Sequence, residues 1–88
     1  FNMKASCLLV DDEPLAIQLL QKHVQEFDTL QLAGSCTNAV EAMAFLQQYS
    51  VDLLFLDIQM PKLTGLEMLK ALKNPPAVII TTAYREYA

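Results

Sequence analysis

The segment VDLLFLDIQMPKLTGLEMLKAL, residues 51–72, decides the fold. It opens with residues 51–56, a mostly apolar run, and Asp57 comes directly after it. Such a near-continuous apolar run is typical of a strand that is covered on both faces, as in a parallel sheet. A short loop then leads to Thr64 and Glu67, whose spacing matches the capping box that begins a helix. The segment therefore predicts a strand, a loop and a helix, with a carboxylate at the carboxyl end of the strand.

The same alternation extends over the rest of the chain. Further short apolar runs, each of a length that suits a strand, cover residues 6–10, 30–36 and 78–80. Helical spacing of apolar residues begins at Pro14 and again after Asn38, where Glu41 completes a second capping-box pattern. In the first helix we expect a core-facing stripe that also includes His23 and is formed by Ala16, Leu19, Leu20, Val24 and Phe27.

The resulting order, βαβαβαβ with short connections, predicts an α/β fold with a doubly wound parallel sheet. In such sheets the functional crevice lies outside the carboxyl ends of the strands. Polar residues come after three of the predicted strands at this edge, namely Asp11, Asp12, Asp57, Thr81 and Thr82. If the first and third strands are neighbours, we expect the three carboxylates to converge.

Converging carboxylates indicate a particular chemistry. Like charges that crowd together are costly unless a cation neutralises them, and Mg²⁺ takes one or two carboxylates together with waters and a phosphate. An ionised Asp at the same edge can act as a nucleophile and form an aspartyl phosphate, and a Thr hydroxyl can donate to a phosphoryl oxygen. The combination predicts Mg²⁺-dependent phosphoryl transfer.

Taken singly, the same residues have simpler interpretations. Acidic residues before a helix interact with the positive end of its dipole, an Asp after a strand is a common turn residue, and Thr favours strands. The feature that favours a site is the combination of acids after two strands with Thr after a third.

Composition and charge narrow the class of protein. The 88 residues include 53% hydrophobic side chains with 2 Gly and 4 Pro, which excludes disorder and predicts one small domain. A net charge of −4 argues against direct binding of nucleic acid, which relies on clustered Lys and Arg. No apolar run approaches the roughly 18 residues of a membrane span.

Two cysteines and the start of the chain bear on its location. Cys7 and Cys36 lie within apolar runs and not at a metal-type spacing, so we expect two buried thiols. The start lacks the apolar region of a secretory signal peptide, and we expect a cytoplasmic protein. We interpret Met3 as the natural start, with Phe1 and Asn2 as residues added before it.

At this point the chain resembles a known family, the receiver domain of two-component response regulators. The resemblance covers about residues 4–88, and its motifs are VDDE, FLDIQMP, TGLE and TTA at 10–13, 55–61, 64–67 and 81–83. DEPLA at 12–16 and AYREYA at 83–88 resemble the LytTR (LytR/AlgR) subclass, whose members usually carry a C-terminal DNA-binding domain.

The resemblance implies a role for each acidic residue. Asp57 would accept a phosphoryl group from a sensor histidine kinase. Asp11 and Asp12 would hold Mg²⁺, Asp12 more directly, and Asp57 with the backbone carbonyl of Gln59 would complete the protein ligands. The domain would then act as a signalling phosphoacceptor and not as a metabolic enzyme.

The resemblance also implies a switch. Thr82, directly before Ala83, would be the hydroxyl that moves toward the phosphoryl group, which leaves Thr81 as a strand residue. Either Tyr84 or Tyr87 would take part in the accompanying aromatic rearrangement, and the sequence does not choose between them.

The family pattern continues beyond this sequence. Members have a Lys after a fifth strand that pairs with the phosphoryl group, and neither Lys62 nor Lys70 matches it. We therefore expect residues 1–88 to be an N-terminal fragment of the receiver domain, an incomplete flavodoxin-like fold that lacks most of helix four, strand five and helix five. An uncovered fourth strand would be an open sheet edge, so we expect weak stability, a homodimer or strand exchange.

Two other function classes stay open. A haloacid-dehalogenase-like phosphatase or phosphotransferase also uses Asp and Mg²⁺, but its nucleophile comes after the first strand, usually in an Asp-x-Asp motif. A pseudo-receiver that is never phosphorylated would act as an interaction module. A histidine-phosphotransfer role for His23 would require an all-helical bundle, which the predicted strands contradict.

Overall fold

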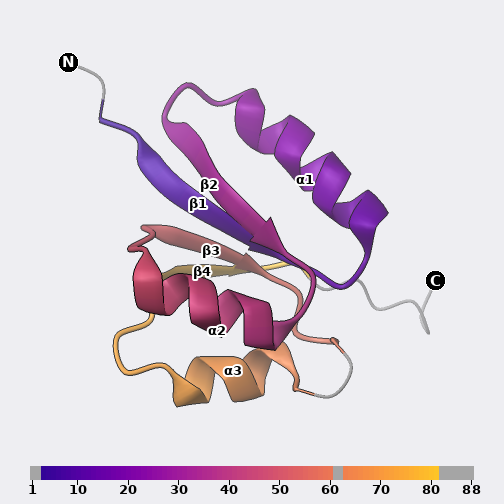
Figure 1. Ribbon diagram of the computed structural model, residues 1–88. Helices are drawn as coiled ribbons and strands as arrows, with labels where there is room; N and C mark the ends of the chain where they lie inside the picture. Colours follow the sequence, from indigo (N-terminus) through magenta and orange to yellow (C-terminus); the bar gives the residue numbers. More distant parts are fainter. Residues whose placement is uncertain (1–2, 61–62, 82–88) are drawn as a thin grey trace.

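The computed structural model describes residues 3–60 and 63–81. Strands and helices alternate through these residues in the order β1 (Ala5–Val10), α1 (Pro14–Gln25), β2 (Leu30–Cys36), α2 (Ala39–Gln48), β3 (Leu53–Leu56), α3 (Gly65–Ala71) and β4 (Ala77–Ile80). All strand pairs are parallel, in the order β2-β1-β3-β4 (Figure 1). The predicted α/β alternation and parallel sheet are confirmed, with strand boundaries that differ by one or two residues.

The register of the sheet brings the strand ends level. Val10, the last residue of β1, pairs with Leu56, the last residue of β3, and Leu56 pairs in turn with Ile80 at the end of β4. β1 lies at the centre, and its last four residues are fully buried. The first and third strands are therefore adjacent, which meets the condition for convergence of the acids, and the residues directly after β1, β3 and β4 lie at one edge of the sheet.

Helices cover the two faces of the sheet unequally. α2 and α3 lie on one face and α1 lies on the other (Figure 1). Because successive strand residues point to opposite faces, Leu8 and Val10 join the core under α2 and α3, whereas Leu9 joins the smaller core under α1. Met68 of α3 is fully buried in the larger core, so this helix is anchored by packing as well as by its cap.

The predicted stripe on α1 is wrong in part. Ile17 and Val24 are buried and face Leu9, whereas Leu19 and Phe27 are each 58% exposed. His23, predicted within the stripe, is also exposed. Leu19 lies two positions after Ile17, about 200° around the helix, so a helix that turns Ile17 to the sheet turns Leu19 to solvent.

The predicted capping box is present at the start of α3 but only in part at the start of α2. The Thr64 hydroxyl accepts from the N–H of Glu67 at 3.2 Å, and the Glu67 carboxylate accepts from the N–H of Thr64 at 3.0 Å. At α2, Asn38 accepts from the N–H of Glu41 at 2.8 Å, as expected. The Glu41 carboxylate does not return to Asn38; it accepts from the N–H and the hydroxyl of Thr37.

The β4 edge is the most exposed part of the sheet. Among the described residues β4 pairs only with β3, and Ile79 and Ile80 are 43% and 48% exposed. Exposed apolar side chains on an edge strand favour pairing with another strand. None of the helices in the described ranges has the length and apolar character that a membrane-spanning helix requires.

Candidate metal site at the carboxyl ends of β1 and β3

The first residue beyond each strand is held by the neighbouring strand. The N–H of Asp11 donates to the carbonyl of Cys36 at 3.1 Å, and the N–H of Asp57 donates to the carbonyl of Val10 at 2.9 Å. The sheet ladder thus continues one residue past the ends of β1 and β3. Asp11 and Asp57 are fixed by backbone hydrogen bonds, although neither belongs to a strand.

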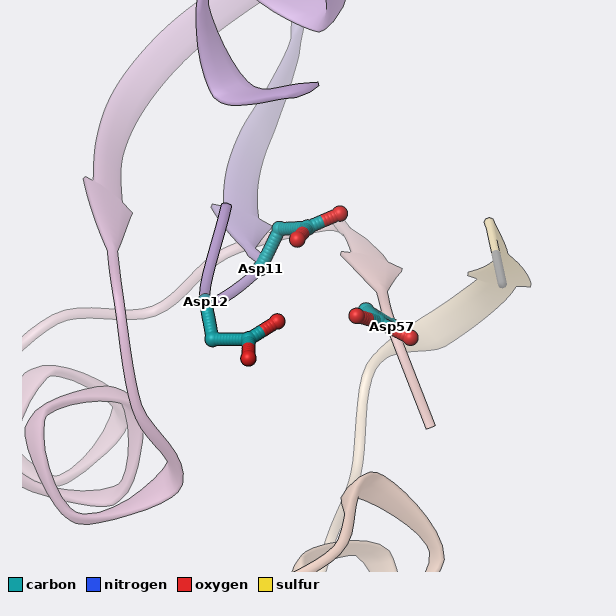
Figure 2. A group of neighbouring side chains, drawn as sticks. All are labelled: Asp11, Asp12 and Asp57. Carbon is teal, nitrogen blue, oxygen red and sulfur yellow. The ribbon is translucent and has the colours of Figure 1, made fainter. Parts of the chain in front are cut away.

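Three carboxylates converge at this edge. One carboxylate oxygen from each of Asp11, Asp12 and Asp57 lies within 4.8 Å of the other two. Figure 2 shows the three side chains turned toward a common space, two from the end of β1 and one from the end of β3. Asp11 and Asp57 are 5% and 9% exposed, and Asp12 is half-buried. The predicted convergence of these acids is confirmed as geometry.

Local turns orient two of the carboxylates. Oδ1 of Asp11 accepts from the N–H of Glu13 at 2.9 Å, and Oδ1 of Asp57 accepts from the N–H of Gln59 at 2.9 Å. Both are bonds from an Asp to the N–H two residues on, the geometry that makes Asp a frequent turn residue. The simpler interpretation of Asp57 as a turn residue is therefore also true, and the turn sets the direction of its carboxylate.

The three neighbouring acidic side chains at this edge of the sheet favour the binding of a cation. Burial raises the pKa of Asp11 above its ordinary value of 3.8, and the neighbouring charges of Asp57 and Asp12 raise it further, against the hydrogen bond from Glu13. Three acidic oxygens in a partly dry site repel one another. Carboxylate oxygens are the hard donors that Mg²⁺ binds, and this ion takes few protein ligands and keeps several waters. The residues present fit that ion.

The remaining predicted site residues are described only in part. Gln59 is exposed, and its N–H is the donor that orients the Asp57 carboxylate. Thr81 comes directly after β4, and its N–H donates to the carbonyl of Leu56 at 3.0 Å. The Thr81 hydroxyl oxygen is buried and has no hydrogen-bond partner among the described residues. Thr82, Tyr84 and Tyr87 lie outside the described residues.

One residue next to the site was missed by the sequence reasoning. Gly65, the first residue of α3, is buried directly against the backbone of Asp57 and Ile58. Two signals were present: Gly65 belongs to the TGLE motif at 64–67, and it is a glycine directly after the capping residue Thr64, where a better helix former would be expected.

Comparison with known proteins decides the family. The sequence model of the protein family described as the response regulator receiver domain matches residues 7–88. The chain belongs to this family. The predicted receiver fold is confirmed, because the receiver domain of Klebsiella pneumoniae mrkE has a TM-score of 0.79 and 29% identity, covering 93% of this chain and 70% of that one. The response regulator domain of Thermotoga maritima CheB has a TM-score of 0.79 and 28% identity, covering 88% and 59%.

The curated relatives of this receiver domain include transcriptional regulatory proteins and uncharacterized response regulatory proteins. The transcriptional regulatory protein BtsR of Escherichia coli K12 is 45% identical over 83 residues, which make up 92% of this chain and 35% of BtsR. An uncharacterized response regulatory protein of Vibrio cholerae is 39% identical over 85 residues, 94% of this chain and 36% of that protein. The receiver chain thus spans about a third of the length of the curated relatives it matches.

Proposed function

We propose that this receiver domain accepts a phosphoryl group on Asp57 from the phosphohistidine of a sensor histidine kinase. The observation that carries the proposal is the convergence of Asp11, Asp12 and Asp57, with one oxygen of each within 4.8 Å of the others. An oxygen of the Asp57 carboxylate attacks phosphorus, the phosphorus–nitrogen bond of the phosphohistidine breaks, and the imidazole leaves with the bonding electron pair.

Mg²⁺ is the cofactor in this proposal. Asp11, Asp12, Asp57 and the backbone carbonyl of Gln59 would hold it, and it would neutralise charge on the phosphoryl oxygens. Support comes from the oxygen donor set and from the raised pKa of Asp11, which burial and the nearby acids cause. The chain's own contribution is to hold the carboxylates in place before any ligand arrives, through the bonds from Glu13 and Gln59.

The switch in this proposal is Thr82. Leu56 directly precedes Asp57, and its carbonyl accepts from the N–H of Thr81, which directly precedes Thr82. This pairing supports a Thr82 hydroxyl near the phosphorylated carboxylate. Phosphorylation would then shift a pre-existing equilibrium between two conformations of the segment after β4.

The kinase would dock on α1. Leu15, Leu19 and His23 of α1 are exposed, as is Phe27 two residues after the helix ends, and we call these four residues the α1 ridge. The helix begins at Pro14, two residues after Asp12, so a partner helix lying along this ridge would reach the acidic site at its end. Exposed apolar side chains such as Leu15 and Leu19 beside a reaction site are typical of a protein–protein contact.

The output of the full-length protein would be control of transcription through a C-terminal DNA-binding domain. This part of the proposal rests on the likeness to the transcriptional regulatory protein BtsR of Escherichia coli and of Salmonella typhimurium. Assignment to the LytTR subclass rests on the DEPLA and AYREYA motifs, the second of which lies outside the described residues. A cytoplasmic location is proposed on the same likeness, since transcription is regulated where the DNA is.

The exposed edge of β4 supports one more partner, a second copy of the chain. Ile79 and Ile80 are exposed on opposite faces of a strand that pairs only with β3 among the described residues. Pairing or exchange of such strands between two copies would cover both the edge and these side chains.

A direct test uses a small phosphodonor. The 88-residue chain is treated with acetyl phosphate and Mg²⁺, and its intact mass is measured beside Asp57→Asn and Asp28→Asn. Asp28 is an exposed acid between α1 and β2, so its variant is the matched control. We expect one added phosphoryl group on the wild type and on Asp28→Asn, and none on Asp57→Asn.

The same test separates the other function classes. A modification that persists in Asp57→Asn would refute the proposed acceptor. A wild type that takes no phosphoryl group, even as the full-length protein, would favour the pseudo-receiver. Turnover of many phosphomonoesters would favour the haloacid-dehalogenase-like phosphatase, against which the family assignment already argues.

A further inference from the structure

The first turn of α3 closes directly onto the backbone that carries Asp57. Gly65 is buried at the start of the helix, and its N–H donates to the carbonyl of Ile58 at 3.4 Å. A Cβ atom at Gly65 would lie 2.7 Å from the carbonyl oxygen of Asp57, 2.8 Å from Cα of Ile58 and 3.0 Å from Cγ of Leu56. The two nearest atoms are backbone atoms, so no rotation of a side chain could relieve these contacts.

Both α3 and the end of β3, the two elements that meet at this contact, are held in place by other interactions. α3 is held by the capping box of Thr64 and Glu67 and by Met68, which is fully buried in the larger core. Leu56 is fully buried between the neighbouring strands, and the N–H of Asp57 is bonded to Val10. A side chain at position 65 would therefore press directly on the peptide between Asp57 and Ile58, which holds the two nearest atoms.

That peptide also orients the acceptor. It lies between Asp57 and Gln59, whose N–H donates to Oδ1 of Asp57 at 2.9 Å. A shift of the peptide moves the donor relative to the carboxylate, and with it the oxygen that faces Asp11 and Asp12. Groups that orient metal ligands without touching the metal commonly change affinity by about 10–100-fold when they are altered.

We propose that Gly65 is a positioning residue: its lack of a side chain lets α3 pack against the Asp57 carbonyl and thereby sets the carboxylate of Asp57 toward Asp11 and Asp12. The inference rests on the proposed function, because it assigns a role toward the same site. It adds that the acceptor loop is braced from α3, a helix that contributes none of the three carboxylates.

Gly34 offers a matched control within the chain. A Cβ atom there would meet Cε2 of Phe45 at 3.0 Å, Cζ of Phe45 at 3.3 Å and Cδ1 of Leu8 at 3.7 Å. All of these are side-chain atoms, and the Phe45 ring at the partly exposed side of α2 can shift by a few tenths of an ångström. Gly34→Ala thus makes the same chemical change without pressing on the backbone of Asp57.

The experiment compares Gly65→Ala with Gly34→Ala in the 88-residue chain. Mg²⁺ binding is titrated by calorimetry without a phosphodonor, circular dichroism monitors the fold, and amide NMR signals of Asp11, Asp57 and Gln59 report local geometry. We expect Gly65→Ala to weaken Mg²⁺ binding about tenfold or more, because it changes the orientation of the Asp57 carboxylate. Gly34→Ala is expected to stay within about twofold of the wild type.

A second pair of variants keeps the test decisive if Gly65→Ala does not fold. Thr64→Ala and Asn38→Ala each remove a helix cap, but only Thr64 anchors the helix that braces Asp57. Thr64→Ala must weaken Mg²⁺ binding more than Asn38→Ala does. Equal affinities in both pairs would overturn the positioning role.

The experiment distinguishes failure of the positioning role from failure of the proposed function. Loss of Mg²⁺ affinity in Gly65→Ala supports the positioning role even if no phosphodonor modifies the wild type, in which case only the phosphoacceptor proposal fails. A wild type that binds no Mg²⁺ would overturn both.

Discussion

The backbone N–H of Asp57, the first residue after β3, donates to the carbonyl of Val10, the last residue of β1, at 2.9 Å. The same one-residue extension links Asp11 to Cys36 and Thr81 to Leu56. The carboxyl edge of the sheet is thus fixed across all four strands before any ligand binds. Carboxylates that are already fixed lose little conformational freedom when they bind a cation. In the absence of a cation, the same arrangement leaves their negative charges close enough to repel one another.

Replacing Asp11 by Asn should stabilise the metal-free chain at neutral pH. Burial and nearby acids raise the pKa of Asp11, so the folded state binds its proton more tightly than the unfolded state does. The contribution of Asp11 to stability is therefore largest below its ordinary pKa of 3.8 and is lost as pH rises through the raised folded-state pKa. Asp11→Asn removes this loss, and urea unfolding without metal at pH 7 measures the gain.

Adding Mg²⁺ should make the wild type more stable than Asp11→Asn, the reverse of their order without metal. At about one hundred times its dissociation constant, a ligand that binds only the folded state adds roughly 2.7 kcal/mol. We expect this increment for the wild type and little of it for Asp11→Asn, which keeps an acceptor for the N–H of Glu13 but lacks the charge. An equal Mg²⁺ increment in both proteins would exclude Asp11 from the cation site.

Much of this fold and site was predictable because apolar runs and the acids after them are local features. The orientation of α1 was not, because Leu15, Ile17, Leu19 and Leu20 surround the helix with apolar residues, and only contact with Leu9 selects Ile17. The role of Gly65 depends on contact with a backbone eight residues earlier in the chain. Periodicity carries no information about such a contact.

The capping box of α3 should make stability depend on pH. Hydrogen bonds from Thr64 lower the pKa of Glu67 below its ordinary value of 4.5. A carboxylate with a lowered folded-state pKa contributes stability above the unfolded value, and that contribution is lost as pH falls through the folded value. The stability difference between wild type and Glu67→Gln should therefore be positive at pH 7 and shrink in acid, as urea unfolding at several pH values would measure. A difference independent of pH would contradict this assignment.

Thr64→Ala should cost about 1 kcal/mol of unfolding free energy at neutral pH, the usual loss of a helix N-cap. Asn38→Ala at the start of α2 should cost a similar amount, because its side chain accepts the equivalent bond from Glu41. Chemical denaturation of both variants checks this equality. It also sets the baseline against which their different effects on Mg²⁺ binding are compared.

The edge of β4 should make the 88-residue chain associate as its concentration rises. Ile80→Lys places a charge on the exposed edge strand, which disfavours pairing between copies. Sedimentation velocity over a wide concentration range should show association of the wild type and a monomer for Ile80→Lys. Leu66→Lys on α3 replaces another exposed apolar side chain and serves as the control. A wild type that stays monomeric throughout would refute the second-copy proposal.

The α1 ridge should matter for the kinase and not for a small phosphodonor. Leu15 and Leu19 are 73% and 58% exposed, so replacing both by Ala removes contact surface while the core stays intact. We expect phosphotransfer from a cognate kinase to slow about tenfold or more, as when central contact residues of an interface are truncated. Phosphorylation by acetyl phosphate should be unchanged, because Leu15 and Leu19 carry no group of the acidic site.

Met3→Ala is the matched control for the ridge, because Met3 is 80% exposed and precedes β1 at the opposite edge of the sheet. Its phosphotransfer rate should equal that of the wild type with both donors. If Leu15→Ala/Leu19→Ala slows both donors alike, the substitutions act on the site itself. If it slows neither, the kinase binds elsewhere. Only a loss confined to the kinase assigns the ridge to docking, because the two donors share the chemistry at Asp57 and differ in the protein surface they must contact.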